Sequence, residues 1–381
     1  MKRKKITTRL FIFITQNLLF IACSTPASQD NLANTDVMTP STTIEATATI
    51  EPTATPTPTP DLHEYDFTVT FAGDLSLADN GDVMPAYVER GEDLAKCIVP
   101  QLISIMQEAD IMWINNEFTY STTGQPLPDK AYTFRAHPSR VSILKELGVD
   151  IVGLANNHVY DYGKQAMLDT LDTLDEAGIP YVGAGRNLNE ATTPYYMEED
   201  GKTIAFVAAS RAEKTKMTPQ ATEDNPGILR CYDNTLFLEE IKEARENADF
   251  VIALPHWGTE YSTTLEQVQI DTAKEYIDAG ADAIIGTHTH CIQGFDFYNG
   301  KPIAYSLGNY WFNSKTLDSM LVTLHFYGDD NQQNLDVEII PAIQTNYTTS
   351  LLTGEDASNY YKRLQDISFN AVIENGKAQE P

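Results

Sequence analysis

Cysteine is scarce in this chain, and the few cysteines present argue against a disulfide framework or a cysteine-based redox motif. The 381 residues include four cysteines, and no two of them have C-x-x-C spacing. Beyond Cys23 there remain Cys97, Cys231 and Cys291, which we expect to be buried free thiols; the alternative that two of them pair stays open. Cys291 follows His290 directly, but adjacent residues at a strand end point apart, so we do not expect the two to share a ligand.

Basic residues are also few, which argues against a nucleic-acid partner. Lysine and arginine number 26 against 54 acidic residues, so the formal net charge is −28. Five of those basic residues lie within residues 1–22, where no acidic residue occurs, so loss of this segment would change −28 to −33. Such a balance repels phosphate backbones. An anionic substrate would need local positive charge, which a metal ion supplies; a highly soluble extracellular surface is the alternative explanation of the charge.

The N-terminus has no apolar run long enough to span a membrane comfortably. Residues 1–9 are basic, and the apolar residues 10–22 are interrupted by Gln16 and Asn17. The ending Leu-Phe-Ile-Ala before Cys23 resembles a bacterial lipobox, although Phe20 is not the usual aliphatic residue. We therefore expect a lipoprotein signal peptide at 1–22, lipidation of Cys23, and a location on the extracellular face of the cell membrane. A plain secretory signal is the alternative.

Residues 23–62 have the composition of a spacer. They are rich in Ser, Thr, Ala, Pro and Asn, and they end in alternating Thr and Pro at 55–60. Alternating Thr-Pro favours an extended, semi-rigid chain without a core. We expect a disordered tether that lifts a folded domain away from the membrane.

From residue 65 onward, strand and helix patterns alternate, which predicts an α/β domain with parallel strand pairing. Predicted strands cover 66–72, 110–114, 150–155, 181–183, 203–209, 249–254, 282–285, 303–306, 321–326 and 336–340. Predicted helices cover 97–107, 138–147, 165–177, 236–246 and 265–279. The late strands have little helix between them, which indicates a second sheet or a hairpin edge. We expect one domain at 63–350 and a peripheral, helical extension at 351–381.

Polar clusters follow five of the predicted strands. They are Gly73-Asp74, Asn115 to Glu117, Asn156 to His158, His256, and His288 with His290. Taken singly, each is ordinary turn chemistry or a structural histidine. In a parallel sheet, however, all five reach the same edge. Together they supply two carboxylates, an amide and three imidazoles, which are ligands suited to Mn²⁺, Fe or Zn²⁺.

The order Asp, Glu, Asn-His, His, His-x-His, each after a strand, resembles the calcineurin-like metallophosphoesterase superfamily. Within it, the chain resembles the CapA family, which is linked to poly-γ-glutamate capsule synthesis. The resemblance covers roughly residues 66–315. The motifs that carry it are Phe71 to Asp74, Asn115 to Glu117, Leu154 to His158 with Asp161 to Gly163, His256 to Tyr261, Gly286 to His290, and Tyr305 to Asn309.

The resemblance implies a four-layer α-β-β-α sandwich with a site for one or two divalent ions. Glu117 stands where a carboxylate bridges both ions. The remaining ligands implied are Asn157, His256 and His288 for one ion, and Asp74 and His290 for the other. His158 stands where a histidine acts as general acid, and Asp161 would orient it. Arg135 is a candidate anion clamp, and Asn309 is a second candidate for substrate binding.

Three positions depart from the superfamily pattern. Asp74 is followed by Leu75 and Ser76, where Asp-x-His is usual, so one imidazole is missing and occupancy by two ions is open. Glu117 replaces the usual Asp. Thr289 stands between the two histidines, where related chains often have Pro.

Three functions remain open at this point. The first is metal-assisted hydrolysis or transfer in synthesis, release or anchoring of an anionic envelope polymer, with polymer synthase subunits as partners. The second is a non-catalytic scaffold or polymer-binding subunit that keeps a metal for structure. The third is a secreted phosphodiesterase or nucleotidase.

Overall fold

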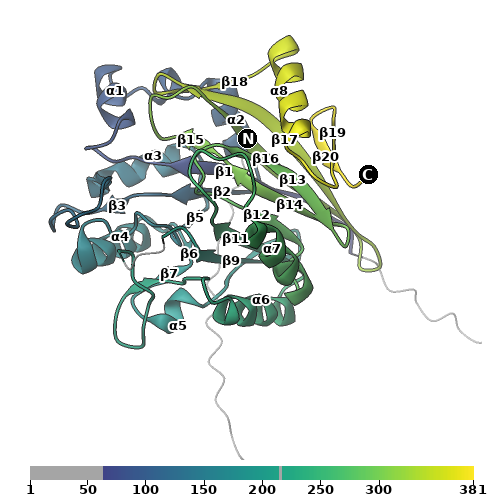
Figure 1. Cartoon of the computed structure of the whole chain (residues 1–381), viewed down its shortest axis with the longest axis horizontal. Coiled ribbons are helices and arrows are strands. Elements are labelled where there is room, and N and C mark those ends of the chain that lie inside the picture. Colours follow the sequence, from purple (N-terminus) through teal and green to yellow (C-terminus); the bar gives the residue numbers. More distant parts are fainter. Residues whose placement is uncertain (1–62, 214–216) are drawn as a thin grey trace, which may run out of the picture. The chain divides into compact units, whose positions relative to one another are not determined.

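The computed structural model describes residues 63–213 and 217–381 (Figure 1). The predicted signal peptide, the lipidated Cys23 and the tether lie outside these residues. Within them, no helix is both long enough and apolar enough to cross a membrane.

The larger of two main sheets in the described residues has ten strands, and its centre is β1 (Tyr65–Leu75). On one side of β1 the strands are parallel: β2 (Ile111–Asn116), β5 (Ile151–Gly153) and β6 (Tyr181–Val182). On the other side, antiparallel pairing adds β16 (Leu317–Gly328) and β17 (Gln333–Thr345). Two short strands attach off this path: β15 (Asn309–Trp311) to β1 and β18 (Thr348–Leu351) to β17.

The second sheet has six strands in the described chain. Its order is β13 (Ile292–Tyr298), β14 (Lys301–Leu307), β12 (Ala283–Ile285), β11 (Phe250–His256), β9 (Lys202–Ser210) and β8 (Tyr195–Glu199). Strands β9, β11, β12 and β14 are parallel. Two small ladders complete the strands: β3 (Thr119–Tyr120) with β4 (Arg135–Ala136), and β7 (Ala184–Gly185) with β10 (Gly227–Ile228).

Helices begin and end where the sequence signals predict. The helices between the sheet strands are α1 (Val83–Glu89), α2 (Pro100–Glu108), α3 (Val141–Glu146), α4 (Gly163–Ala177), α5 (Leu188–Ala191), α6 (Thr235–Asn247) and α7 (Gln267–Ala279). Helix α4 ends at Gly178, whose φ of 69° is the left-handed conformation that glycine adopts freely. Helix α7 begins with a capping box between Glu266 and Gln269, which satisfies two backbone N–H groups.

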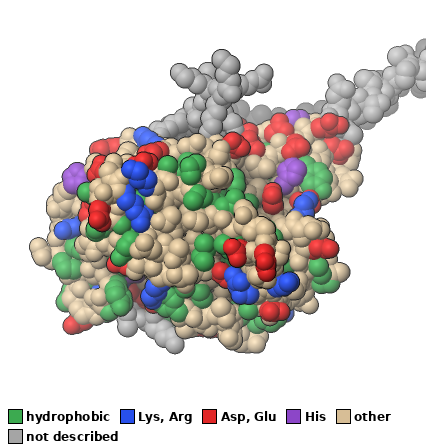
Figure 2. Space-filling view, turned by 90° about the horizontal axis from the view of Figure 1, so that it is seen from above, with side chains coloured by type: hydrophobic (Ala, Val, Ile, Leu, Met, Phe, Trp, Pro, Cys, Tyr) green, Lys and Arg blue, Asp and Glu red, His purple; other side chains and the backbone are tan. Residues whose placement is uncertain are grey.

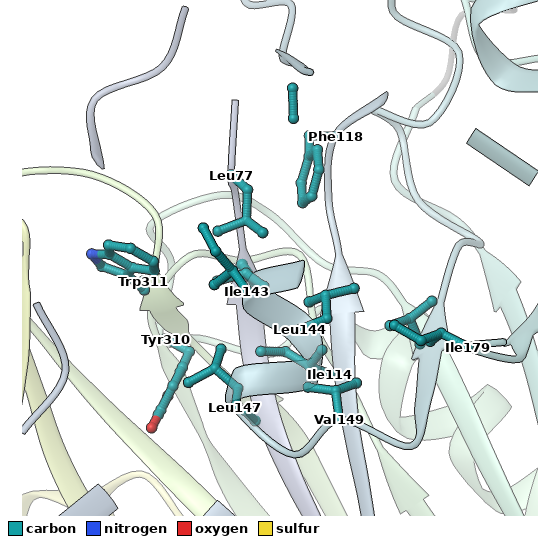
Figure 3. Close-up of a cluster of buried hydrophobic side chains, with 14 of the residues drawn as sticks. Leu77, Ile114, Phe118, Ile143, Leu144, Leu147, Val149, Ile179, Tyr310 and Trp311 are labelled. Atoms are coloured by element: carbon teal, nitrogen blue, oxygen red, sulfur yellow. The ribbon is translucent and has the colours of Figure 1, made fainter. Parts of the chain in front are cut away.

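Buried side chains in the described residues fall into three hydrophobic clusters, and these define four layers. One cluster lies between the two sheets and includes Phe71, Phe206 and Ile252. A second packs the outer face of the larger sheet against α2, α3 and α4, and Figure 3 shows part of it, with Ile114 beside Leu144. The third packs the smaller sheet against α6 and α7. The predicted α-β-β-α sandwich is therefore confirmed.

The last thirty residues are helical only in part, which corrects the sequence-based expectation. Helix α8 (Gly354–Asp366) forms, but β19 (Val372–Glu374) and β20 (Lys377–Gln379) follow it as a hairpin. Strand β20 pairs with β17 and so widens the larger sheet. Tyr360 and Leu364 of α8 are buried in the cluster between the sheets, so this segment completes the core. Strands of three residues are too short to show an alternating pattern.

The outer surface seen in Figure 2 carries both acidic and basic side chains, interspersed among apolar ones. No broad basic face is visible in that view, which agrees with the acidic balance of the whole chain. The predicted repulsion of phosphate backbones therefore holds for this face.

Candidate metal centre

The candidate site lies where the carboxyl ends of parallel strands from both sheets meet. Asp74 is near the end of β1, and His256 is the last residue of β11. His288 and His290 lie in the loop after β12. The backbone N–H of His288 donates to Asp74 Oδ1 at 3.3 Å, which joins the two sheets directly. All four side chains are buried.

The backbone around the histidine pair is unusual in two ways. His288 and His290 have φ of 96° and 56°, in the region that non-glycine residues rarely adopt, and such strain gathers at functional sites. Gly286 precedes them where a Cβ would lie 2.0 Å from the carbonyl oxygen of Tyr305. Only glycine lets the strand approach so closely. The local sequence therefore turns two imidazoles toward Asp74 rather than into the core.

Among the described residues, two groups of side chains offer ligand atoms that all lie within 4.8 Å of one another. One is Glu117 with His256 and His288, and the other is Asp74 with Glu117 and His290. Every member is buried. Glu117 belongs to both groups, as would a carboxylate that bridges two ions.

Asparagine side chains hold this cluster together. Asn115 donates through Nδ2 to Asp74 Oδ1 at 2.8 Å and to Glu117 Oε2 at 3.0 Å. Asn157 Oδ1 lies 2.8 Å from His256 Nε2, so this amide also reaches the group. Asn156 donates to Asn115 Oδ1 at 3.1 Å. The amides thus fix the two carboxylates that would otherwise repel each other.

Several polar atoms of the centre have no hydrogen-bond partner among the described residues, and this fits a metal ion. They include Glu117 Oε1 and His288 Nδ1, both fully buried. Glu117 Oε1 lies 3.7 Å from His256 Nε2 and 3.8 Å from His290 Nε2, so nitrogen ligands face it from two sides. An unpaired buried carboxylate is costly. A divalent cation between these atoms would satisfy all of them.

The pKa shifts in the centre have identifiable causes. Burial, and then the charge of Asp74, raise the pKa of Glu117 well above its usual range. Burial would also raise the pKa of Asp74, but the hydrogen bond and charge of His290 outweigh it and hold that pKa low. Burial lowers the pKa of His256 strongly and that of His288 to about 3. Both rings are therefore neutral near pH 7, which is the form that binds metal.

The balance is opposite at His290. Burial lowers its pKa, but the hydrogen bond to Asp74, at 3.2 Å, outweighs burial and raises it. Asn309 Oδ1 accepts from His290 Nδ1 at 2.9 Å, and the pKa of His290 is raised by this contact too. Asn309, expected to bind substrate, thus contacts a histidine of the cluster.

A model of the family described as "Bacterial capsule synthesis protein PGA_cap" matches residues 68–314. The chain belongs to this family. The protein "Capsule biosynthesis protein CapA" of Bacillus anthracis is 36% identical over 253 residues, which cover 64% of this chain and 60% of that protein. "PGA biosynthesis protein CapA" of Bacillus subtilis (strain 168) is 34% identical over 266 residues, which cover 67% and 69%. The resemblance to CapA seen in the motifs is confirmed.

Solved structures with a related arrangement are more distant. The "NAD nucleotidase (NadN)" of Haemophilus influenzae matches 80% of this chain and 57% of its own, at 11% identity and a TM-score of 0.43. A "hypothetical protein" from Thermus thermophilus matches 72% and 99%, at 17% identity and a TM-score of 0.41. The four layers themselves, and not these neighbours, establish the fold of this PGA_cap chain.

The remaining predicted residues of this PGA_cap chain lie at different distances from the cluster. His158 Nδ1 lies 2.7 Å from Asp161 Oδ2, and its Nε2 is 3.9 Å from Glu117 Oε1, so this pair stands at the centre. Arg135 lies over the ring of Tyr162, at 4.2 Å, and donates to backbone carbonyls. It lines a separate cavity of about 430 Å³. Its role as an anion clamp stays a prediction.

Sequence reasoning missed two residues of this site. One is Asn115, which the sequence pattern assigns to turn chemistry although alternation along a strand puts it on the same face as Glu117. The other is Lys130, which lies in the segment between β3 and β4 and forms an ion pair with Asp161 at 2.8 Å. No local pattern marks a loop lysine as buried. The three described cysteines are free thiols, and neither ligand group contains one.

Proposed function

We propose that this chain acts in the synthesis, release or anchoring of poly-γ-glutamate or a related anionic envelope polymer, through a metal-dependent hydrolytic or transfer site. Membership of the PGA_cap family and the names of the Bacillus relatives support the polymer. We place the chain on the extracellular face of the membrane, anchored through Cys23, with polymer synthase subunits as partners. The observation that carries the chemistry is the buried Glu117 shared between two ligand groups.

The ligand groups name the residues that would hold metal. Glu117, His256 and His288, with the amide oxygen of Asn157, would hold one ion, and Asp74, Glu117 and His290 the other. When bound, Mn²⁺, Fe or Zn²⁺ supplies Lewis-acid polarisation and a bound water that ionises near neutral pH.

The chain's own proton-transfer residue is His158. The Asp161 carboxylate oxygen beside Nδ1 also accepts the backbone N–H of Phe134, at 2.7 Å. A carboxylate accepts, so Nδ1 carries the proton and Nε2 faces the cluster. Nε2 can therefore give a proton to a leaving group. The ring of Phe134, 4.6 Å away, packs against the imidazole and shields it from water.

A non-catalytic scaffold is the second candidate, and Ser76 favours it. Ser76 stands where the superfamily pattern has an imidazole, and its buried hydroxyl has no hydrogen-bond partner in the described part of the chain. The second ligand group therefore has one imidazole instead of two. A weaker second site would suit a structural metal.

A His158→Ala variant separates these candidates, with His325→Ala as the matched control. His325 is half-exposed and pairs with Asp66 on the sheet surface, away from the centre. Cells lacking the gene are complemented with each variant, and polymer yield and chain length are measured. Purified protein is also assayed on poly-γ-glutamate and on a generic phosphodiester.

Hydrolysis or transfer requires that His158→Ala lowers turnover by about 10²- to 10⁴-fold while metal content stays constant. A scaffold would tolerate the same change, and normal polymer from His158→Ala cells would contradict the enzymatic proposal. Turnover of the phosphodiester alone would instead indicate a phosphodiesterase.

A further inference from the structure

Lys130 is a buried lysine whose ammonium group is fully engaged beside the metal centre. Its side chain is 7% exposed. Nζ lies 2.8 Å from Asp161 Oδ1 and 2.9 Å from Glu213 Oε1, and it donates to the backbone oxygen of Asn157. An ammonium group has three protons to donate, and here each has an acceptor.

These contacts join segments that belong to different sheets. Lys130 lies between β3 and β4, next to the larger sheet, whereas Glu213 follows β9 of the smaller sheet. Thr218, also beyond β9, donates to the same Asn157 oxygen at 2.8 Å. The peptide that carries Asn157 into the cluster is therefore held from both sides.

We infer that Lys130 is a positioning residue, which sets the His158 ring through Asp161 and the Asn157 amide through its backbone oxygen. This inference rests on the proposed function of His158. One oxygen of Asp161 accepts from His158 and from the backbone of Phe134, and Lys130 holds the other. With both oxygens occupied, the carboxylate has one orientation. The imidazole then keeps Nδ1–H toward Asp161 and Nε2 toward Glu117.

A purely structural ion pair would not require this arrangement. Replacing buried ion pairs with apolar groups is often neutral for stability, so three satisfied contacts beside two site residues indicate a role in geometry. Lys130 contacts the residues on both sides of the Asn157–His158 peptide bond through its partners. Loss of the ammonium would free Asp161 to turn and would release one of two donors from the Asn157 oxygen.

The test is the tautomer of His158, read from its ring ¹⁵N signals by NMR at one pH. The full-length protein is measured as purified and after metal removal, and His158→Gln identifies the signals. The variants are Lys130→Met, Lys130→Arg and the control Lys164→Met, which removes an exposed lysine that bonds Asn225. If Lys130→Met does not fold, the double variant with Glu213→Gln removes the stranded second carboxylate.

We expect wild type and Lys164→Met to show the single Nδ1–H tautomer. Lys130→Met should show mixed tautomers, and Lys130→Arg should restore the single form in large part. Unchanged His158 signals in Lys130→Met, or in the double variant, would overturn the inference. If hydrolysis is found, kcat should fall at least tenfold in Lys130→Met with KM nearly constant. The ring signals need no activity, so failure of the proposed function leaves this test intact.

Discussion

Replacing Glu117 with glutamine should stabilise the metal-free protein while abolishing its stabilisation by metal. Glu117 and Asp74 are both fully buried, and the ligand atoms of their group lie within 4.8 Å of one another. Two like charges at that separation repel by about 3.5 kcal/mol at an effective dielectric constant of about 20. Glutamine removes this repulsion and can donate its amide to Asp74. Because Asn115 already offsets part of the repulsion, we expect a gain of about 1 to 3 kcal/mol.

The gain should depend on pH in a defined direction. The pKa of Glu117 in the folded protein is raised above its ordinary value of 4.5. A raised carboxyl pKa means that the folded state holds a proton that the unfolded state releases. Wild-type stability is therefore intact below pH 4.5 and falls as pH rises through the folded pKa. Glu117→Gln should match wild type near pH 4.5 and exceed it at about pH 8.

Metal should reverse the order of stability. An ion at about 100 times its Kd stabilises a folded protein by about 2.7 kcal/mol. Glu117 belongs to both ligand groups, so its loss should remove this effect entirely. The assay is urea unfolding at about pH 5 and about pH 8, with EDTA or with Mn²⁺ or Zn²⁺.

Glu240→Gln is the control for this experiment. Glu240, on α6, is also fully buried with a strongly raised pKa, and its oxygens have no partner in the described residues. Its variant should gain stability but keep the metal effect. The reasoning is refuted if Glu117→Gln is less stable than wild type in EDTA at the higher pH, or if metal still stabilises it.

Three further outcomes are expected. His288 has a folded pKa of about 3 against 6.5 unfolded, so metal-free stability is present above pH 6.5 and is lost as pH falls; His288→Gln should flatten the fall by about 1.4 kcal/mol per pH unit, measured by urea unfolding in EDTA between about pH 4 and pH 6. Gly73→Ala should destabilise by about 3 kcal/mol or more, because a Cβ there would lie 1.9 Å from the Gly308 oxygen, and an unchanged melting temperature would contradict that packing. Cys23→Ala should move the protein from the membrane fraction to the medium, and retention in the membrane would disprove lipid anchoring.

The sequence predicted the residues that stand at the ends of strong strand patterns. Asp74, His256 and His288 each follow an apolar run, and parallel strands bring such ends to one edge. Which side chains share an ion depends on how the two sheets pack, and family resemblance rather than spacing implies the two groups. The geometry of the structure places the same side chains together.

Lys130 and the C-terminal hairpin were beyond the reach of sequence patterns for physical reasons. Lys130 is buried because segments from two sheets meet over it, and such long-range contacts leave no periodicity in the chain. Strands β19 and β20 have three residues each, so their pairing with β17 is decided by packing rather than by alternation.

Metal stoichiometry of the purified protein, by elemental analysis, tests the central claim most directly. The account predicts two equivalents of a divalent ion, falling to one in Asp74→Ala and to none in Glu117→Gln, because Glu117 alone belongs to both ligand groups. Equal metal content in wild type and Glu117→Gln, or no bound metal in wild type, would contradict it.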